Sequence, residues 1–169
     1  METTPLQNKN DMLRFFIEGC RKKITKEYLG KIAKCLELLS DDDVWWRAHE
    51  TNNSVGNIIL HLAGNVRQWI YQHLGEKEFQ RNRDNEFSER THIPKSELMN
   101  HLRSAVEDVD IVLRDLPVEK LSNRYTIQKY HVTGLEVVLH VTEHFSYHVG
   151  QIAYITKLRT GKDLKFYNL

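Results

Sequence analysis

The sequence predicts an all-α protein with the architecture of a four-helix bundle. Four long stretches carry apolar residues at steps of three and four, the period of a helix that buries one face. Proline, glycine and helix-capping residues separate these stretches, and none of the four shows the strict alternation typical of a strand. Long amphipathic helices of this kind favour a bundle around one core.

The first helix is expected over Asp11 to Leu39. Its apolar stripe comprises Leu13, Phe16, Ile17, Cys20, Ile24, Tyr28, Ile32, Cys35 and Leu39. The run Ser40–Asp43 is expected to end this helix and to begin a loop. Trp45 and Trp46 would then lie in a connector, where their rings cover one end of the bundle.

The second helix is expected to begin at Ser54, a good N-cap, and to run to Leu74 before Gly75. The segment 76–90 that follows is charged and poor in apolar residues, which predicts a mobile surface loop. Such a loop can also act as a lid, but plain surface is the simpler interpretation. The third helix is expected over 95–116, between two prolines.

Residues 118–132 show no helical period, and 125–127 alternates only weakly, which indicates at most a short extended piece. Thr133 and Glu136 form a capping box that opens the fourth helix. This helix is expected to run to Thr160, where Gly161 stops it.

Length and composition indicate one domain over residues 1–169, which would bury roughly 70% of the surface of the unfolded chain. The 24 basic and 23 acidic residues nearly cancel, so a nucleic-acid partner is not expected. No apolar run approaches the ~20 residues of a membrane span, and residues 1–5 lack the features of a signal peptide. We therefore expect a cytoplasmic protein without a membrane partner.

The two cysteines are expected to be free core residues. Cys20 and Cys35 fall in one helix, which separates them by roughly 22 Å along the axis. A disulfide needs Cα atoms within about 7 Å of each other.

Three of the nine histidines form a row in the fourth helix: His140, His144 and His148. Residues four apart share one helix face, with Cβ atoms about 5–6 Å apart, so two of them can grip one metal ion. On a helical wheel the apolar stripe passes closest to His148, next to His144 and farthest from His140. The pair His144 and His148 is therefore the best placed at the edge of the core.

His61 lies at the edge of the apolar stripe of the second helix and would close a three-nitrogen site. Taken alone, it is more simply a buried histidine that hydrogen-bonds to a neighbour, and histidine rows also arise on ordinary helix surfaces. A metal site and this structural interpretation both stay open at this point. The sequence has no H-E-x-x-H, which argues against a zinc protease, and no Glu-x-x-His repeat on facing helices, which argues against a di-iron site.

Two segments, Asn57–Asn65 and His144–Gln151, resemble segments of the DinB-like superfamily of bacterial four-helix proteins, in particular an uncharacterised branch of it. Helix order and the spacing between the two segments extend the resemblance over essentially the whole chain. It implies a divalent metal bound by His61, His144 and His148, and a homodimer. Relatives of known activity include bacillithiol- and mycothiol-dependent transferases and isomerases, which implies a thiol-dependent enzyme with a small-molecule substrate.

Three neutral imidazoles leave coordination positions open on a divalent metal, for which zinc or nickel is the expected choice. A low-molecular-weight thiol bound there would lose its proton and attack an electrophile, whereas metal-bound hydroxide would hydrolyse an ester or amide. No carboxylate is evident as a base on the ligand face, which favours thiol transfer. Asn65 and Gln151 are the candidates to orient the imidazoles or a substrate, ahead of Gln68 and Tyr147.

A non-catalytic alternative has the same ligands. The metal would only staple two helices, or the bundle would serve as a binding or stress-response module. A structural metal site normally fills its coordination sphere with protein ligands, and His140 is the residue that would do so here.

Overall fold

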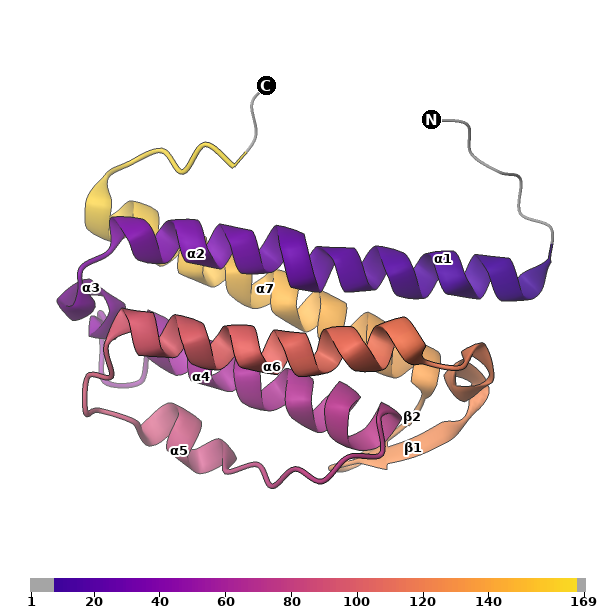
Figure 1. Ribbon diagram of the computed structural model, residues 1–169. Helices are drawn as coiled ribbons and strands as arrows, with labels where there is room; N and C mark the ends of the chain where they lie inside the picture. Colours follow the sequence, from indigo (N-terminus) through magenta and orange to yellow (C-terminus); the bar gives the residue numbers. More distant parts are fainter. Residues whose placement is uncertain (1–7, 167–169) are drawn as a thin grey trace.

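The computed structural model describes residues 8–166, which are mostly helical with one small two-stranded sheet (Figure 1). The first helical segment comprises α1 (Lys9–Lys22), a π-helical stretch η1 (Lys23–Tyr28) and α2 (Leu29–Leu38). The side chain of Asn8 caps its start by accepting hydrogen bonds from two backbone amides. The helix predicted over 11–39 is confirmed and begins two residues earlier.

The prediction of a loop at Ser40–Asp43 is wrong. A short helix, α3 (Asp41–Trp45), begins there, and Ser40 and Asp43 form its capping box. Trp45 therefore lies on a helix rather than in the connector, with 3% of its surface exposed and its indole donating to the carbonyl of Ile93. A capping box followed by two buried residues is enough to turn a helix end into a new helix.

The second predicted helix is confirmed as α4 (Val55–Val66) followed by the π-helical stretch η2 (Arg67–Leu74). Ser54 is its N-cap, and Asn57 completes a capping box. The Asn57 amide also donates to the backbone carbonyl of Glu86, 3.0 Å away. The start of α4 is thereby tied to the segment that follows it.

The prediction that 76–90 is only a mobile surface loop is wrong. This segment contains α5 (Arg83–Ser88), which packs along α4. Glu86 on α5 is 8% exposed despite its charge, because its carboxylate is paired within the protein. The charged composition of the segment hides this buried pair.

The third predicted helix is α6 (Lys95–Asp115), and a 3₁₀ turn η3 (Val118–Ser122) follows it. The strands β1 (Arg124–Ile127) and β2 (Tyr130–Thr133) then form an antiparallel hairpin in which Arg124 pairs with Thr133. The short extended piece expected at 125–127 is thus one strand of a pair, and the all-α prediction needs this small sheet added to it.

The last helix, α7 (Gly134–Thr160), has the expected capping box of Thr133 and Glu136 at its start. It ends where Gly161 adopts φ = 65°, a left-handed conformation that glycine accepts without a steric penalty. Both predicted ends of this helix are confirmed.

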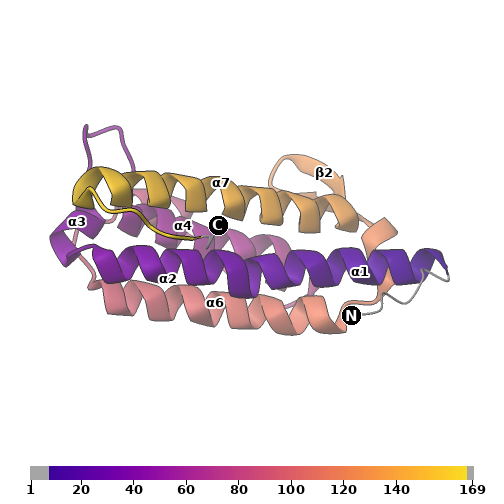
Figure 2. The ribbon, with the colours of Figure 1, turned by 90° about the horizontal axis from the view of Figure 1, so that it is seen from above.

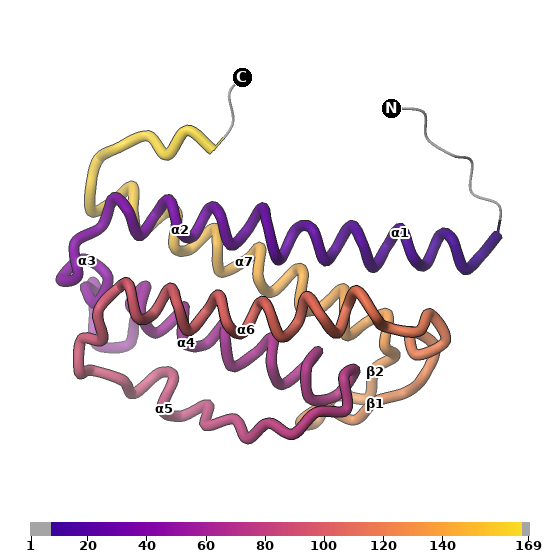
Figure 3. The backbone as a smooth tube through the Cα atoms, viewed as in Figure 1, coloured from indigo at the N-terminus to yellow at the C-terminus, as the bar shows by residue number. Residues whose placement is uncertain are grey.

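The long helical segments lie side by side around a shared core. α4 packs against α6 and α7, and the α1–α2 segment contacts the same two helices from the other side of the core. Seen from above, α7 and α6 flank α1–α2, and α4 lies beneath (Figure 2). The tube in Figure 3 shows α3 at one end of the molecule and the β-hairpin at the other. This arrangement makes α4 and α7, which carry the candidate ligands, direct neighbours.

Both cysteines are free and buried, as predicted, and burial raises the pKa of each thiol. Within residues 8–166, the helices are all too short or too polar to cross a membrane.

Candidate metal centre

Three histidines from two helices bring their ring nitrogens together in the structure. His61 projects from α4, and His144 and His148 project from adjacent turns of α7. The Nε2 atom of His144 lies 3.1 Å from Nε2 of His61 and 3.2 Å from Nε2 of His148. One ligand atom from each of the three residues lies within 4.8 Å of the others. This group can hold a metal ion.

The two short nitrogen separations match a shared ion. With Zn–N bonds of about 2.0–2.1 Å, tetrahedral coordination places neighbouring ligand nitrogens about 3.3–3.4 Å apart, and octahedral coordination about 2.9–3.0 Å. The separations of 3.1 and 3.2 Å fall between these values. Two of the three nitrogen pairs thus already have the spacing that a shared ion requires.

The proton on His61 is fixed by a carboxylate. Its Nδ1 lies 3.0 Å from Oε2 of Glu86 and 3.1 Å from Nη2 of Arg81, which already donates to that same oxygen. A carboxylate only accepts hydrogen bonds, so a proton on Nδ1 of His61 satisfies Glu86. Nε2 is then left with a lone pair directed at the other two histidines. This is the tautomer that a metal ligand requires.

Arg81 holds this carboxylate in place. Its guanidinium donates two hydrogen bonds of 2.7 Å to the two oxygens of Glu86, and its side chain is 4% exposed. Burial raises the pKa of the Glu86 carboxyl, but the hydrogen bonds from Arg81 and His61 outweigh burial and lower this pKa below its usual value. Glu86 is therefore ionised at neutral pH.

His148 is oriented by Gln151, one turn further along α7. The side-chain oxygen Oε1 of Gln151 lies 2.7 Å from Nδ1 of His148. With that oxygen as the acceptor, Nδ1 carries the proton and Nε2 again keeps its lone pair. Gln151 is thus placed as the sequence suggested, next to a candidate ligand.

His144 and His148, the two candidate ligands on α7, are uncharged at neutral pH. Burial, together with the nearby His148, His61 and other basic groups, lowers the pKa of His144 to about 3. Burial also lowers the pKa of His148 to about 4, against a raising effect of Gln151. Neutral imidazoles are the form that binds metals.

Two buried polar atoms make no hydrogen bond within the described part of the chain, Nδ1 of His144 and Oδ1 of Asn65. Nδ1 of His144 has no partner among residues 8–166 in either tautomer. When Nδ1 carries the proton, the lone pair of Nε2 faces those of His61 and His148 at 3.1 and 3.2 Å, an arrangement that a cation between them would stabilise. The residues present therefore fit a metal ion.

His140 stands apart from this group. Its ring packs against Trp69 at an angle of 35°, with centroids 4.1 Å apart, and it lies 5.6 Å from the ring of His144. Half-burial lowers the pKa of His140. The structure thus brings together the three histidines selected from the helical wheels and gives the fourth an aromatic neighbour instead.

The other candidates from the sequence have different surroundings. Asn65 is 4% exposed, one turn after His61, and no bond joins it to the three histidines. Gln68 accepts hydrogen bonds from Arg81 and from Gln128, so it contacts the histidine site only through Arg81. Tyr147 is 64% exposed.

Sequence reasoning missed Glu86 and Arg81, which hold His61 in place. Both fall in the charged segment that was assigned to the surface. One signal was present in α4: a Cβ at Gly64 would collide with the Glu86 carboxylate, so glycine is required for the close approach of α5. A glycine inside a helix often marks such an approach.

The fold and the site together define a class: a mostly helical protein in which two neighbouring helices supply three histidines for a metal. The chain belongs to the DUF1572 family, described as proteins of unknown function, which it matches over residues 11–169. A search of curated proteins found no match.

A solved structure similar to this one is entitled "Crystal structure of the conserved protein of locus from Enterococcus faecalis". It aligns with 93% of this chain and 100% of its own, with a TM-score of 0.64. The two sequences are 14% identical, so the likeness concerns the fold alone.

Proposed function

We propose that this protein is a divalent-metal-dependent enzyme, with a DinB-like four-helix-bundle fold, that activates a small thiol for transfer to an electrophilic substrate. The observation that supports it is the convergence of three imidazoles, two of which are oriented by hydrogen bonds to Glu86 and Gln151. Zinc or nickel suits this ligand set. The DinB-like resemblance of the two histidine segments supports the thiol.

A divalent ion held by three uncharged ligands supplies uncompensated positive charge, which lowers the pKa of a bound thiol from its ordinary value near 8.5. His61, His144 and His148 would hold the ion. Arg81 and Glu86 keep the His61 ring from rotating, and Gln151 does the same for His148.

In the proposed reaction the thiol sulfur forms a bond to the electrophilic carbon of the substrate. The leaving group departs with the electron pair of its own bond, and the thiol proton passes to solvent. No oxidant or reductant takes part, so the protein needs to supply only binding and charge.

Hydrolysis is the weaker alternative because it needs a base beside the metal. Within residues 8–166, no aspartate or glutamate joins the three-histidine group. Glu86, the acidic residue next to it, contacts Nδ1 of His61, on the opposite edge of the ring from Nε2, and is paired with Arg81. Its position fits orientation of the ligand rather than attack on a substrate.

Cobalt substitution tests the thiol step and separates it from a structural staple between α4 and α7. The metal-free protein is loaded with Co²⁺ and titrated with 2-mercaptoethanol while its absorption spectrum is recorded. A new near-ultraviolet sulfur-to-cobalt band is expected, because the site keeps an open position. A cobalt spectrum that does not respond to the thiol would contradict thiol activation. A metal that only links α4 and α7 structurally would then be the better account.

We also propose that the protein is a homodimer, as the resemblance implies. α7 exposes the apolar side chains of Leu139 and Tyr147 on one face, apart from the pocket-lining Tyr154 and Leu158. Sedimentation equilibrium should show a dimer that the double substitution Leu139→Glu and Tyr147→Glu converts to a monomer. A monomeric native protein would contradict this proposal.

A further inference from the structure

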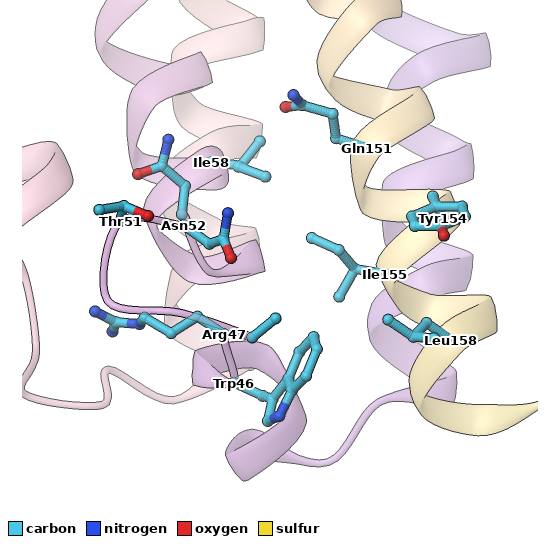
Figure 4. Close-up of a pocket in the computed structure, with 11 residues that line it drawn as sticks. Trp46, Arg47, Thr51, Asn52, Ile58, Gln151, Tyr154, Ile155 and Leu158 are labelled. Carbon is cyan, nitrogen blue, oxygen red and sulfur yellow. The ribbon is translucent and has the colours of Figure 1, made fainter.

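A pocket lies beside the histidine site, shares Gln151 with it and is lined by none of the three histidines. It is bounded by the connection between α3 and α4 and by the second half of α7, and has a volume of about 360 Å³ (Figure 4). Pockets that bind small molecules typically measure about 300–1,000 Å³. The size is therefore suited to a small organic ligand.

One part of the pocket is apolar and has a fixed aromatic wall. Ile58 from α4 and Ile155 from α7 point into the gap between the helices, and the ring of Trp46 closes the lower end (Figure 4). The guanidinium of Arg159 covers the Trp46 ring at 4.8 Å and is itself held by Asp43. A ring held in this way offers a flat surface on which a ligand ring can pack.

The polar groups that face the pocket are uncharged with one exception. Asn52, Asn53 and Gln151 contribute amides, and Arg47 is the charged lining residue. In Figure 4 the guanidinium of Arg47 points away from the gap between α4 and α7. The chemistry is that of a site for an uncharged molecule with a hydrogen-bonding group.

Gln151 connects this pocket to the histidine site. Its Oε1 is engaged by Nδ1 of His148, whereas its amide Nε2 makes no hydrogen bond to any residue in 8–166. Ile58 lies three residues before His61, about 4.5 Å along the helix axis, so the inner end of the pocket is one turn from a second ligand. A ligand that accepts from Gln151 Nε2 would hold the amide in the orientation that fixes His148.

We propose that this pocket binds a small, uncharged organic molecule with an aromatic body and a carbonyl-type acceptor, and that Gln151 couples its occupancy to His148. The coupling rests on the proposed metal function, but the binding does not. Because coupling between two sites is reciprocal, the ligand should tighten metal binding by the same factor by which the metal tightens ligand binding.

Acetophenone and ethylbenzene form a matched pair of probes, since they differ mainly in the carbonyl group. Each is titrated into the ¹⁵N-labelled, EDTA-treated full chain, and the Trp46 indole and Gln151 amide signals are followed by NMR. Acetophenone should bind about fivefold more tightly, the value of one neutral hydrogen bond. In Gln151→Leu the preference for acetophenone should be lost or reversed, because its carbonyl then has no donor.

Two tryptophan substitutions test the location. Ala48 is exposed and lines the pocket, so Ala48→Trp should fill it and abolish the titration. Ile111→Trp, at an exposed position of α6 away from the pocket, is the control and should bind as the native protein does. Absence of saturable shifts in the native protein, or unchanged binding by Ala48→Trp, would refute the proposal that this pocket binds the ligand.

The coupling is tested by repeating the acetophenone titration with zinc present. The affinity for acetophenone should rise in the native protein and stay unchanged in Gln151→Leu. Equal affinity with and without zinc, in protein shown to contain zinc, would overturn the coupling. Acetophenone binding by a protein that takes up no metal would uphold the pocket and refute the proposed function, so the two failures are distinguishable.

Discussion

At the scale of single residues, the site depends on a chain of hydrogen bonds that sets which nitrogen of each histidine is free. Arg81 holds the Glu86 carboxylate, which lies next to Nδ1 of His61. Gln151 occupies the same position next to Nδ1 of His148. Residues that orient metal ligands in this way commonly contribute a factor of 10–100 to metal affinity.

Glu86→Gln should therefore lower zinc affinity about 10–100-fold, because an amide no longer enforces a proton on Nδ1 of His61. Competition with a chromophoric chelator measures the change. Glu107→Gln, at an exposed position of α6, is the matched control and should bind zinc as the native protein does. Equal affinity in Glu86→Gln and the control would show that the carboxylate does not orient His61.

The low pKa values of His144, about 3, and His148, about 4, predict how stability depends on pH in the metal-free protein. Their pKa is about 6.5 in the unfolded chain, so below that value the unfolded state takes up protons that the folded state refuses. The stabilisation is complete above pH 6.5 and is lost as the pH falls towards 4.

Urea unfolding in EDTA between pH 7 and 4.5 measures this loss, which is at most about 1.4 kcal/mol per pH unit for each histidine. His144→Gln removes one of the titrating groups and should flatten the dependence. A free energy of unfolding that is constant over this range would show that the rings are not buried as described.

At the scale of elements, the helix ends and the row of histidines on α7 were predictable because they depend on local spacing and capping. Thr133 with Glu136 and Gly161 mark the two ends of α7, and a four-residue step alone brings His144 and His148 to one face. That His61 meets them depends on α4 and α7 being neighbours, which the sequence suggested only through a resemblance.

The short elements were not predictable in the same way. α5 has few apolar residues and exists because Glu86 is paired with Arg81 and because Asn57 holds its backbone. These contacts join positions up to 29 residues apart, so no local pattern reveals them. The β-hairpin gave only a weak alternation because each strand has four residues.

The close approach of α5 to α4 can be tested at Gly64. Gly64→Ala should displace the Glu86 carboxylate and should lower both stability, by about 1–3 kcal/mol, and zinc affinity. Gly19→Ala in α1 is the contrasting control, since nothing lies within 4 Å of a Cβ there. In this exposed helical position alanine should stabilise the protein by about 0.5–1 kcal/mol. Thermal unfolding with and without zinc separates the two results, and a neutral Gly64→Ala would refute the packing.

At the scale of the whole molecule, the arrangement of the long helices determines where chemistry can occur. α4 and α7 are neighbours along their length, with the three histidines between them and the pocket one turn further towards α3. A bound metal would link these helices in the folded state only, and should therefore stabilise it by about 2.7 kcal/mol when the free metal is 100 times its Kd.

Metal content is the most direct test of the central claim that His61, His144 and His148 form one metal site. Purified protein and alanine variants at these positions and at His140 are dialysed against zinc or nickel, then analysed by elemental mass spectrometry, with circular dichroism as the check of folding. The native protein and His140→Ala should retain stoichiometric metal, and the other three variants should lose it. A native protein that never retains metal, or equal loss in His140→Ala, would contradict the account.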